Sequence, residues 1–440
     1  MSHIAVIGGG VCGGAAALDL AKAGHDVTLL ERSPNLGGLV VSFTIGGTPL
    51  ECFYHHIFPH EHQVISLIGE LGLADRLEWH PSSVAVFTGG KVWPFTSPVD
   101  LLRFGPLPFV DRIRTGVGAL RLGRVKDWER LDGITAREWL RSYTGRRACE
   151  VVWDPLLGAK FGPAAGQVPA AWMWGRFQQR AGARANGGER LGYLRGGFRQ
   201  LFDGLHAELE RRGVDVRCNT GVASLNVRDG RATGVTLSDG SALDADAVIF
   251  AGSLPGLADL VPTPEVDPRW ASAQGLGVLV VVLELDRPMS QTYWTNVCDP
   301  TLPFGGVIEH TNMLPTSDYG GRHVAYLSRY FTHDEPVAAA VPAEEAQRWI
   351  DALEQRWPSF DRSSVVAVHP FRAPYAAPLV RVGYRGTIPP MHSHIERLYV
   401  STTAQIYPQD RGMSEGVRTG WEVAQLVAAD IARGAGAGAT

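Results

Sequence analysis

Hydrophobic residues at the start of the chain form two short runs separated by a helical stripe. His3–Ile7 is short and apolar, as in a buried parallel strand, and Asp26–Glu31 is a second run of the same kind. Between them, Ala15–Ala23 has helical spacing, and Gly24 follows where glycine commonly ends a helix. The pattern predicts a strand, a helix and a second strand at the N-terminus.

Strands and helices alternate in the same way in two later stretches. The first is expected to hold a helix over 198–212 and strands over 214–218, 222–227, 232–237 and 247–252; the second holds a strand over 398–401 and a helix over 414–433. The stretches between them differ in character. They predict a helix over 60–80, a Gly-Gly hairpin over 84–93, irregular helix over 97–122, strands over 275–331 and a helix over 343–357.

This order is satisfied most simply by one parallel sheet assembled from three separated pieces, with a second domain inserted twice. We therefore predict an α/β protein with a parallel-sheet domain and an inserted mixed α+β domain. The expected segments are 1–80, 191–270 and 396–433 for the parallel-sheet domain, 81–190 and 271–395 for the inserted domain, and 434–440 for a flexible tail.

Composition narrows the possible functions. A formal net charge of −4, with 45% hydrophobic and 20% charged residues, excludes a disordered chain and argues against a nucleic-acid binder. The five cysteines form no C-x-x-C pair, so neither a disulfide scaffold nor a metal site is expected. The first strand leaves no room for a signal peptide, and no apolar run approaches the ~20 residues of a membrane helix. A cytoplasmic location is therefore expected.

Glycines between the first strand and the first helix have the G-x-G-x-x-G spacing of a dinucleotide site. Gly8 permits the tight turn, Gly10 lets the backbone approach a pyrophosphate, and Gly13, followed by Gly14, lets the helix pack close to the sheet. The pyrophosphate would sit on free N–H groups at the helix start, where the macrodipole favours negative charge. Glu31 ends the second strand, where an acid can accept from ribose hydroxyls.

A second glycine pair indicates which dinucleotide is bound. Glu31-Arg32 is followed by Gly37-Gly38, and this E-R-x4-G-G pattern resembles the signature of the glutathione-reductase-type superfamily. The resemblance implies that Arg32, Gly37 and Gly38 help to hold the pyrophosphate of FAD. The expected cofactor is therefore FAD. The parallel-sheet domain is accordingly expected to be a Rossmann-like FAD-binding domain, and the inserted α+β domain to be the substrate domain.

Later segments resemble one branch of that superfamily, the amine oxidase, protoporphyrinogen oxidase and phytoene desaturase group. Residues 192–202 look like its glycine-pair turn and helix. The resemblance implies that Val222 lies near the adenine and that Gly412 and Met413 approach the isoalloxazine ring.

Some segments depart from the pattern of this group. It usually has Gly-Asp after the last strand, with the Asp on the ribityl chain, where this chain has Thr402-Thr403; Asp410 is the candidate replacement. Residues 369–384 look like the protoporphyrinogen-oxidase segment before the final flavin strand, whereas 53–59 and 90–101 resemble UDP-galactopyranose mutase.

Two pairs of ionisable residues are candidates for catalysis. His55 and His56 follow the strand after the pyrophosphate loop, where an imidazole can donate to flavin N5 or O4 or orient a substrate phosphate. The alternative is a pair of hydrogen-bonded structural imidazoles. Glu309 and His310, at the end of a strand in the inserted domain, either line a pocket or belong to a surface loop.

Three single cationic residues and one tyrosine complete the candidate set. Lys160, one of only four lysines, would hold a water at flavin N5 or pair with phosphate if it is buried. Arg372 and Tyr375 lie in a segment that lines the flavin pocket in relatives. Arg411 would neutralise charge near the flavin or the substrate.

The sequence therefore predicts an FAD-dependent oxidoreductase that removes hydride from a small-molecule substrate. A mutase of the UDP-galactopyranose type, using reduced FAD without net redox change, and a non-catalytic flavin protein are the alternatives. No nucleic-acid partner is expected. The Arg-rich segment 103–124 is interpreted as a helical cap over the active site, in preference to a peripheral membrane contact.

Overall fold

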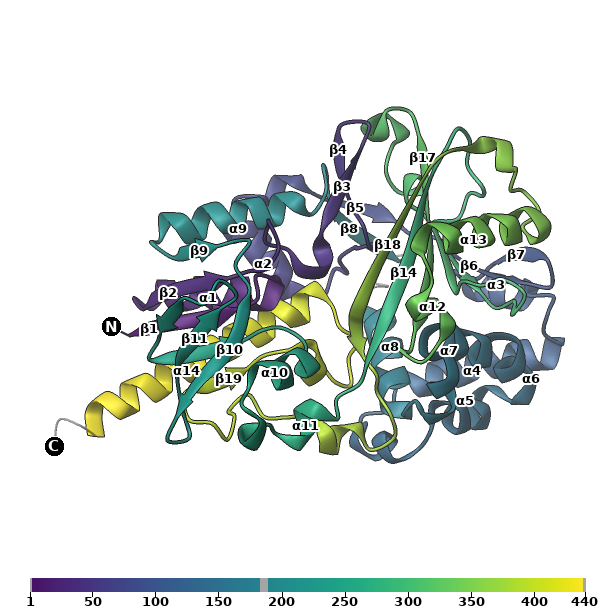
Figure 1. The fold of residues 1–440 in the computed structure, drawn as a ribbon. Coiled ribbons are helices and arrows are strands. Elements are labelled where there is room, and N and C mark those ends of the chain that lie inside the picture. Colours follow the sequence, from purple (N-terminus) through teal and green to yellow (C-terminus); the bar gives the residue numbers. More distant parts are fainter. Residues whose placement is uncertain (1, 183–188, 438–440) are drawn as a thin grey trace.

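The computed structural model describes residues 2–182 and 189–437. One end of the molecule contains a five-stranded sheet whose strands all run parallel (Figure 1). Its order is β19 (Leu398–Val400), β13 (Ala247–Phe250), β1 (His3–Ile7), β2 (Asp26–Leu30) and β9 (Asp215–Arg217). These strands come from three separated parts of the chain, as predicted. The predicted α/β fold class is confirmed.

The helices beside this sheet approach one another through glycines. Helices α1 (Val11–Lys22) and α14 (Met413–Ala437) pack so closely that a Cβ on Gly420 would lie 2.4 Å from the carbonyl oxygen of Cys12. Helix α9 (Arg199–Arg211) packs where a Cβ on Gly14 would lie 2.6 Å from the Leu205 side chain. Close packing of α1 brings its first turn beside the first turn of α14.

A seven-stranded sheet forms the centre of the second half of the molecule. Its order is β18 (Val365–Pro378), β14 (Gly275–Leu285), β17 (His323–Phe331), β16 (Gly306–Glu309), β15 (Trp294–Val297), β6 (Val84–Thr88) and β7 (Lys91–Pro94). Strand β14 is almost entirely buried because both faces of the sheet are covered. Its alternate residues enter two different cores: Val278, Val280 and Val282 one core, and Leu279, Val281 and Leu283 the other.

The first of these cores is continuous with the parallel-sheet domain, and the second is closed by α13 (Pro342–Arg356). A group of helices lies beyond the sheet at the opposite end from β1 and β2 (Figure 1). It comprises α3 (Pro98–Arg103), α4 (Phe109–Leu122), α5 (Ala136–Thr144), α6 (Arg146–Ala148), α7 (Asp154–Phe161) and α8 (Ala170–Gly182).

Smaller elements complete the fold. They are the sheet of β10 (Val222–Arg228), β11 (Arg231–Leu237) and β12 (Ala242–Asp244), the pairs β3 (Ser42–Ile45) with β4 (Thr48–Glu51) and β5 (Leu77–Pro81) with β8 (Arg190–Leu194), and the helices α2 (His62–Glu70), α10 (Leu254–Leu260), α11 (Pro268–Ala271) and α12 (Pro336–Ala339). Within the described ranges, no helix combines the length and hydrophobicity needed to cross a bilayer.

Two element boundaries differ from the prediction. The helix expected over 60–80 ends at Glu70, because Gly72 takes a left-handed φ of 72° and the chain continues into β5. Helix α14 continues to Ala437, so the tail expected from 434 begins as helix, and residues 438–440 lie outside the described residues. The domain limits themselves stay a prediction.

Candidate active site

The turn between β1 and α1 has room only for glycine at two positions. Gly8 has a φ of +106°, and a Cβ there would lie 3.1 Å from the carbonyl oxygen of Ala251. A Cβ on Gly13 would lie 1.9 Å from the carbonyl oxygen of Gly8. The two glycines let α1 begin directly at the carboxyl end of β1, which is where parallel α/β sheets bind ligands.

Bare backbone from two loops borders the space in front of α1. The amide of Gly37 donates to the carbonyl of Gly9 at 2.9 Å, and a Cβ on Gly38 would lie 3.3 Å from the Cα of Gly10. Helix α1 has neither a side-chain cap nor an acidic residue in its first turn. Its free N–H groups and the side-chain-free cradle therefore fit the pyrophosphate of a dinucleotide.

The Glu31 side chain fixes the backbone of this cradle. Its buried carboxylate accepts from the amide of Gly9 at 2.7 Å and from the amide of Ser33 at 2.8 Å. The amide of Thr220 donates to the carbonyl of Glu31 at 2.8 Å, which places the start of β10, with Val222, on the same side. Arg32 is exposed at the adjoining turn.

The start of α14 meets the start of α1. A Cβ on Gly416 would lie 3.2 Å from the side chain of Val11, so the first turns of the two helices are in contact. Met413 is buried at the head of α14, directly after Gly412. That Gly412 and Met413 approach the flavin stays a prediction.

Thr402 serves a local structural purpose. Its hydroxyl accepts from the amide of Ala404, and its amide donates to Oε1 of Gln405 at 2.7 Å, so it caps a short turn after β19. Asp410, the expected substitute on the ribityl chain, is held by Nζ of Lys160 at 2.6 Å and by a guanidinium nitrogen of Arg176 at 3.3 Å. These ion pairs leave the ribityl role of Asp410 without support.

Lys160, Arg176, Tyr330, Asp410 and Arg411 form what we call the cationic cluster. Its members come from α7, α8, β17 and the loop before α14. Burial by itself would raise the pKa of Asp410, but the three cations outweigh burial and hold that pKa below its ordinary value. Burial lowers the pKa of Lys160, and the neighbouring carboxylate opposes that shift. The cluster carries three cationic side chains and one carboxylate.

Aromatic rings support the charges of this cluster. Nζ of Lys160 lies 4.6 Å from the centre of the Trp172 ring and 5.4 Å from that of Tyr330. Arg411 donates to the hydroxyl of Tyr330 at 2.8 Å, and its Nε is buried without a hydrogen-bond partner among the described residues. Burial would raise the pKa of Tyr330, but Arg411 and Lys160 more than offset it, so the net shift is downward.

His55 and His56 are half-buried beside this cluster as neutral imidazoles. Burial lowers the pKa of His55 to about 4, and the charge of Arg411 lowers it further; Nδ1 lies 2.5 Å from the carbonyl of Phe53. Burial and the neighbouring His55 lower the pKa of His56 to about 3, and its Nδ1 lies 3.3 Å from the Tyr293 hydroxyl. Both rings can exchange hydrogen bonds at neutral pH without carrying charge.

Glu309 and His310 are placed away from the cluster, in the packing around β16. Glu309 accepts from the amides of Met289 and Ser290 at 2.9 and 3.0 Å and from the Ser290 hydroxyl. Nε2 of His310 lies 2.7 Å from the Tyr319 hydroxyl. Burial raises the pKa of Glu309 to about 7 and lowers that of His310 to about 3. Their contacts are those of structural residues.

Arg372 is also separated from the cluster. It lies opposite Leu279 in the register of β14 and β18, and Leu279 points into the core closed by α13. Residues directly opposite one another share a face of a sheet, so Arg372 emerges on the α13 side. There it donates to the carbonyls of Ala338 and Ala340 at 2.8 and 2.7 Å. Tyr330 lies opposite Val278, which faces the other way.

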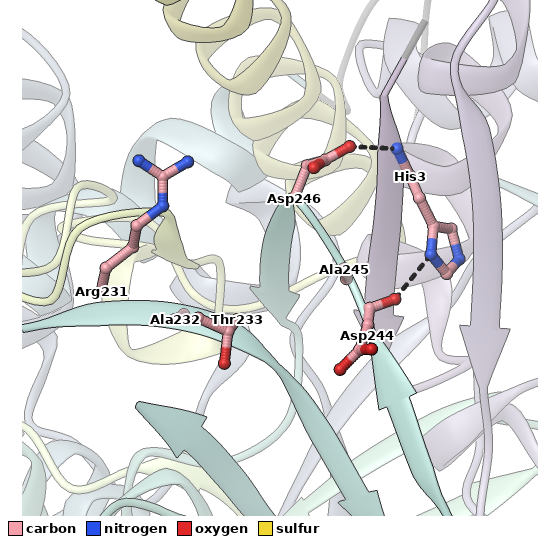
Figure 2. Close-up of a pocket in the computed structure, with 7 residues that line it drawn as sticks. All are labelled: His3, Arg231, Ala232, Thr233, Asp244, Ala245 and Asp246. Atoms are coloured by element: carbon pink, nitrogen blue, oxygen red, sulfur yellow. Dashed lines mark hydrogen bonds between the residues drawn. The ribbon is translucent and has the colours of Figure 1, made fainter. Parts of the chain in front are cut away.

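A shallow cavity of about 450 Å³ lies elsewhere on the molecule (Figure 2). Its wall includes His3, whose amide donates to Oδ2 of Asp246 at 2.9 Å and whose Nδ1 lies 2.7 Å from the carbonyl of Asp244. This cavity is at the amino ends of β1 and β13, the opposite edge of the sheet from the glycine turn. It is not part of the candidate active site.

The chain resembles known proteins over most of its length. It is 26% identical over 322 residues to coproporphyrinogen III oxidase of Propionibacterium freudenreichii, covering 59% of this chain and 58% of that protein. It is 27% identical over 319 residues to 15-cis-phytoene desaturase of Solanum lycopersicum, covering 66% of this chain and 54% of the desaturase. The chain thus spans somewhat more than half the length of these curated relatives.

Solved structures share the fold. Reduced UDP-galactopyranose mutase superimposes with a TM-score of 0.78 at 16% identity, covering 98% of this chain and 96% of the mutase. Putrescine oxidase bound to putrescine gives a TM-score of 0.73 at 18% identity, covering 97% and 99%.

The sequence profile described as flavin containing amine oxidoreductase matches residues 11–428. This match confirms the resemblance noted in the sequence and the expected FAD cofactor. It begins at Val11, the first residue of α1, includes the Gly37-Gly38 side of the cradle and extends through the cationic cluster into α14. The chain belongs to the flavin-containing amine oxidoreductase family.

Proposed function

We propose that this protein is an FAD-dependent oxidoreductase that removes hydride from a neutral or acidic small molecule. One observation carries the proposal: Arg411 of the cationic cluster directly precedes Gly412 and Met413, where α14 begins against the first turn of α1. A single short segment, Arg411 to Met413, therefore connects the cationic cluster to the pyrophosphate cradle.

The residues have distinct tasks in this scheme. Bound FAD would supply the hydride acceptor, which no side chain can provide. Gly10, Gly38 and the first turn of α1 would hold the pyrophosphate, and Glu31 would keep the cradle in shape. Arg411 would stabilise negative charge near the cradle, while neutral His55 and His56 would offer hydrogen bonds.

The charge of the cluster favours one class of substrate. Three cationic side chains surround one carboxylate, so a protonated amine entering this region would be repelled. A neutral substrate is accepted, and a substrate with carboxylates is attracted. Dehydrogenation of a C–C or C–N bond in such a molecule is therefore favoured over oxidation of a cationic polyamine.

Anaerobic reduction of the bound flavin tests this function. We expect purified protein to release FAD on gentle denaturation and the yellow absorption of the holoprotein to bleach with neutral or acidic hydrogen donors. Protonated diamines at the same concentration should leave the flavin oxidised. Bleaching by diamines alone would overturn the substrate assignment, and a protein that neither holds nor takes up FAD would overturn the function.

A sugar-nucleotide mutase is the second candidate, because Lys160, Arg176 and Arg411 converge on one region as a diphosphate site requires. Such an enzyme acts through reduced FAD without net redox change. It predicts that a sugar nucleotide binds and isomerises only after the flavin has been reduced with dithionite. Bleaching of oxidised flavin by substrate would instead establish the oxidoreductase.

A further inference from the structure

Apolar side chains are concentrated on one exposed face of α4. Of the large hydrophobic residues exposed in the described part of the chain, seven of the twelve belong to α3 and α4. On α4 they are Phe109, Val110, Ile113, Val117 and Leu120, with exposed fractions of 63%, 75%, 44%, 44% and 67%. At the helical period these five residues occupy about 100° of the circumference. We call this stripe the apolar face of α4.

The opposite side of α4 is packed tightly. Thr115, Gly118 and Leu122 are buried, and a Cβ on Gly118 would lie 2.8 Å from the carbonyl oxygen of Tyr143 in α5. The helix is therefore fixed with its apolar face outward. Val99 and Leu102 of α3 are exposed beside it, and Arg112 ties the two helices by donating to the carbonyls of Leu102 and Leu107 at 2.7 Å each.

Basic residues border one side of the apolar face. Arg114 and Arg121, seven positions apart, lie exposed along one flank. Between residues 97 and 126 six basic residues stand against two acidic ones, in a chain whose net charge is −4. An exposed apolar stripe bordered by arginines is the pattern of a helix that lies in the interface of an anionic membrane.

The sequence favoured a helical cap over the active site for this segment, but its apolar residues are exposed. We propose instead that the protein docks on anionic lipid surfaces through the apolar face of α4. Phe109, Val110 and Leu120 would enter the boundary between headgroups and acyl chains, and Arg114 and Arg121 would contact lipid phosphates. A second copy of the chain fits this face less well, because an antiparallel twofold contact would bring the two arginine flanks together. Helix α4 belongs to the same helical group as α8, which supplies Arg176 to the cationic cluster.

Vesicle sedimentation of the FAD-loaded protein tests the docking. We expect binding to vesicles of phosphatidylcholine with phosphatidylglycerol, weaker binding to phosphatidylcholine alone, and loss of the difference at high salt. The triple variant F109S/V110S/L120S should bind at least about tenfold more weakly to both kinds of vesicle. The matched variant V341S/V366S/V382S removes three exposed valines from other surfaces and should bind like the wild type.

Charge variants separate contact with lipid phosphates from nonspecific hydrophobic adsorption. R114Q/R121Q should weaken binding to the anionic vesicles about fivefold for each arginine removed, and R228Q/R356Q should have no effect. Retained flavin absorbance and an unchanged melting temperature exclude misfolding of either variant. The proposal fails if the wild type does not bind either vesicle, or if the F109S/V110S/L120S variant binds as well. It also fails if light scattering shows that this face joins two copies of the chain.

Discussion

Nζ of Lys160 lies 2.6 Å from Oδ2 of Asp410, although the two residues are 250 positions apart in the sequence. The pair links α7 of the helical group to the loop that leads into α14. Both side chains are mostly buried, with exposed fractions of 18% and 16%. Asp410 is also the only carboxylate of the cationic cluster. It therefore neutralises part of the charge of three cations, whereas Lys160 is one of three cations that neutralise a single carboxylate.

Removing either member of this pair is therefore expected to have unequal effects. Asp410→Asn leaves Lys160, Arg176 and Arg411 without their shared carboxylate and should lower the free energy of unfolding by about 3 kcal/mol. Lys160→Met leaves Asp410 with two cations and should lower it less. Denaturant unfolding of the FAD-loaded protein measures both changes.

The surface pair Arg199–Asp203 provides the control for this comparison. Its atoms lie 2.7 Å apart with side chains 36% and 59% exposed, so Asp203→Asn should change stability by less than about 1 kcal/mol. Equal losses for Asp410→Asn and Asp203→Asn would show that the buried cluster does not depend on its carboxylate.

Gly10 allows the cofactor cradle to be blocked without disturbing the fold. The nearest atom to a Cβ at this position is the Cα of Gly38, at 3.9 Å, so a side chain there would enter the cradle rather than the core. Gly10→Val should leave the protein folded but weaken FAD binding about hundredfold, which equals a loss of roughly 3 kcal/mol.

Titration of apoprotein with FAD, followed by flavin fluorescence, measures this effect. Gly69→Ala is the matched control, because a Cβ at Gly69 meets no atom within 4 Å and the residue lies in α2. If Gly10→Val protein remained yellow with unchanged affinity, the assignment of the cradle to the pyrophosphate would be wrong.

The parallel sheet and the glycine cradle were predictable because the sequence patterns that indicate them lie within short segments of the chain. Gly8, Gly10 and Gly13 fall within one turn, and their spacing alone implies a strand before them and a helix after them. Gly72 shows the limit of this reasoning: helical spacing continues past it, yet its left-handed backbone ends α2.

The cationic cluster was predictable only in part. Lys160 and Arg411 were candidates, but Arg176 and Tyr330 carry no sequence signal, because their partners lie on other elements and only the fold brings them together. Arg372 was also a candidate but lies outside the cluster. In the register of β14 and β18 it is opposite Leu279, on the face of the sheet that α13 covers. A change of one position along β18 would have reversed its direction.

His56 should not act as an acid or base in the reaction. Burial lowers its pKa to about 3, so the ring is neutral in the folded protein wherever activity can be measured. His56→Asn retains a neutral hydrogen-bonding side chain. We expect it to slow anaerobic flavin reduction about tenfold or less, without moving any pKa in the pH profile of the rate. Stopped-flow reduction across pH checks this, and loss of a limb near neutral pH in the variant would contradict it.

Glu309 should make the stability of the protein depend on pH. Burial raises its pKa from the ordinary 4.5 to about 7, so the folded protein keeps a proton that the unfolded chain releases between these values. Its contribution to stability is therefore complete below about pH 4.5 and declines as the pH rises to about 7.

Glu309→Gln keeps an acceptor for the two amides and a donor for Ser290 but does not ionise. Relative to the wild type, the variant should gain stability with rising pH, to at most about 3 kcal/mol. Thermal unfolding across this range, with Glu129→Gln on the surface as control, measures the gain; parallel curves for wild type and E309Q would show that Glu309 is ionised in the folded protein at every pH tested.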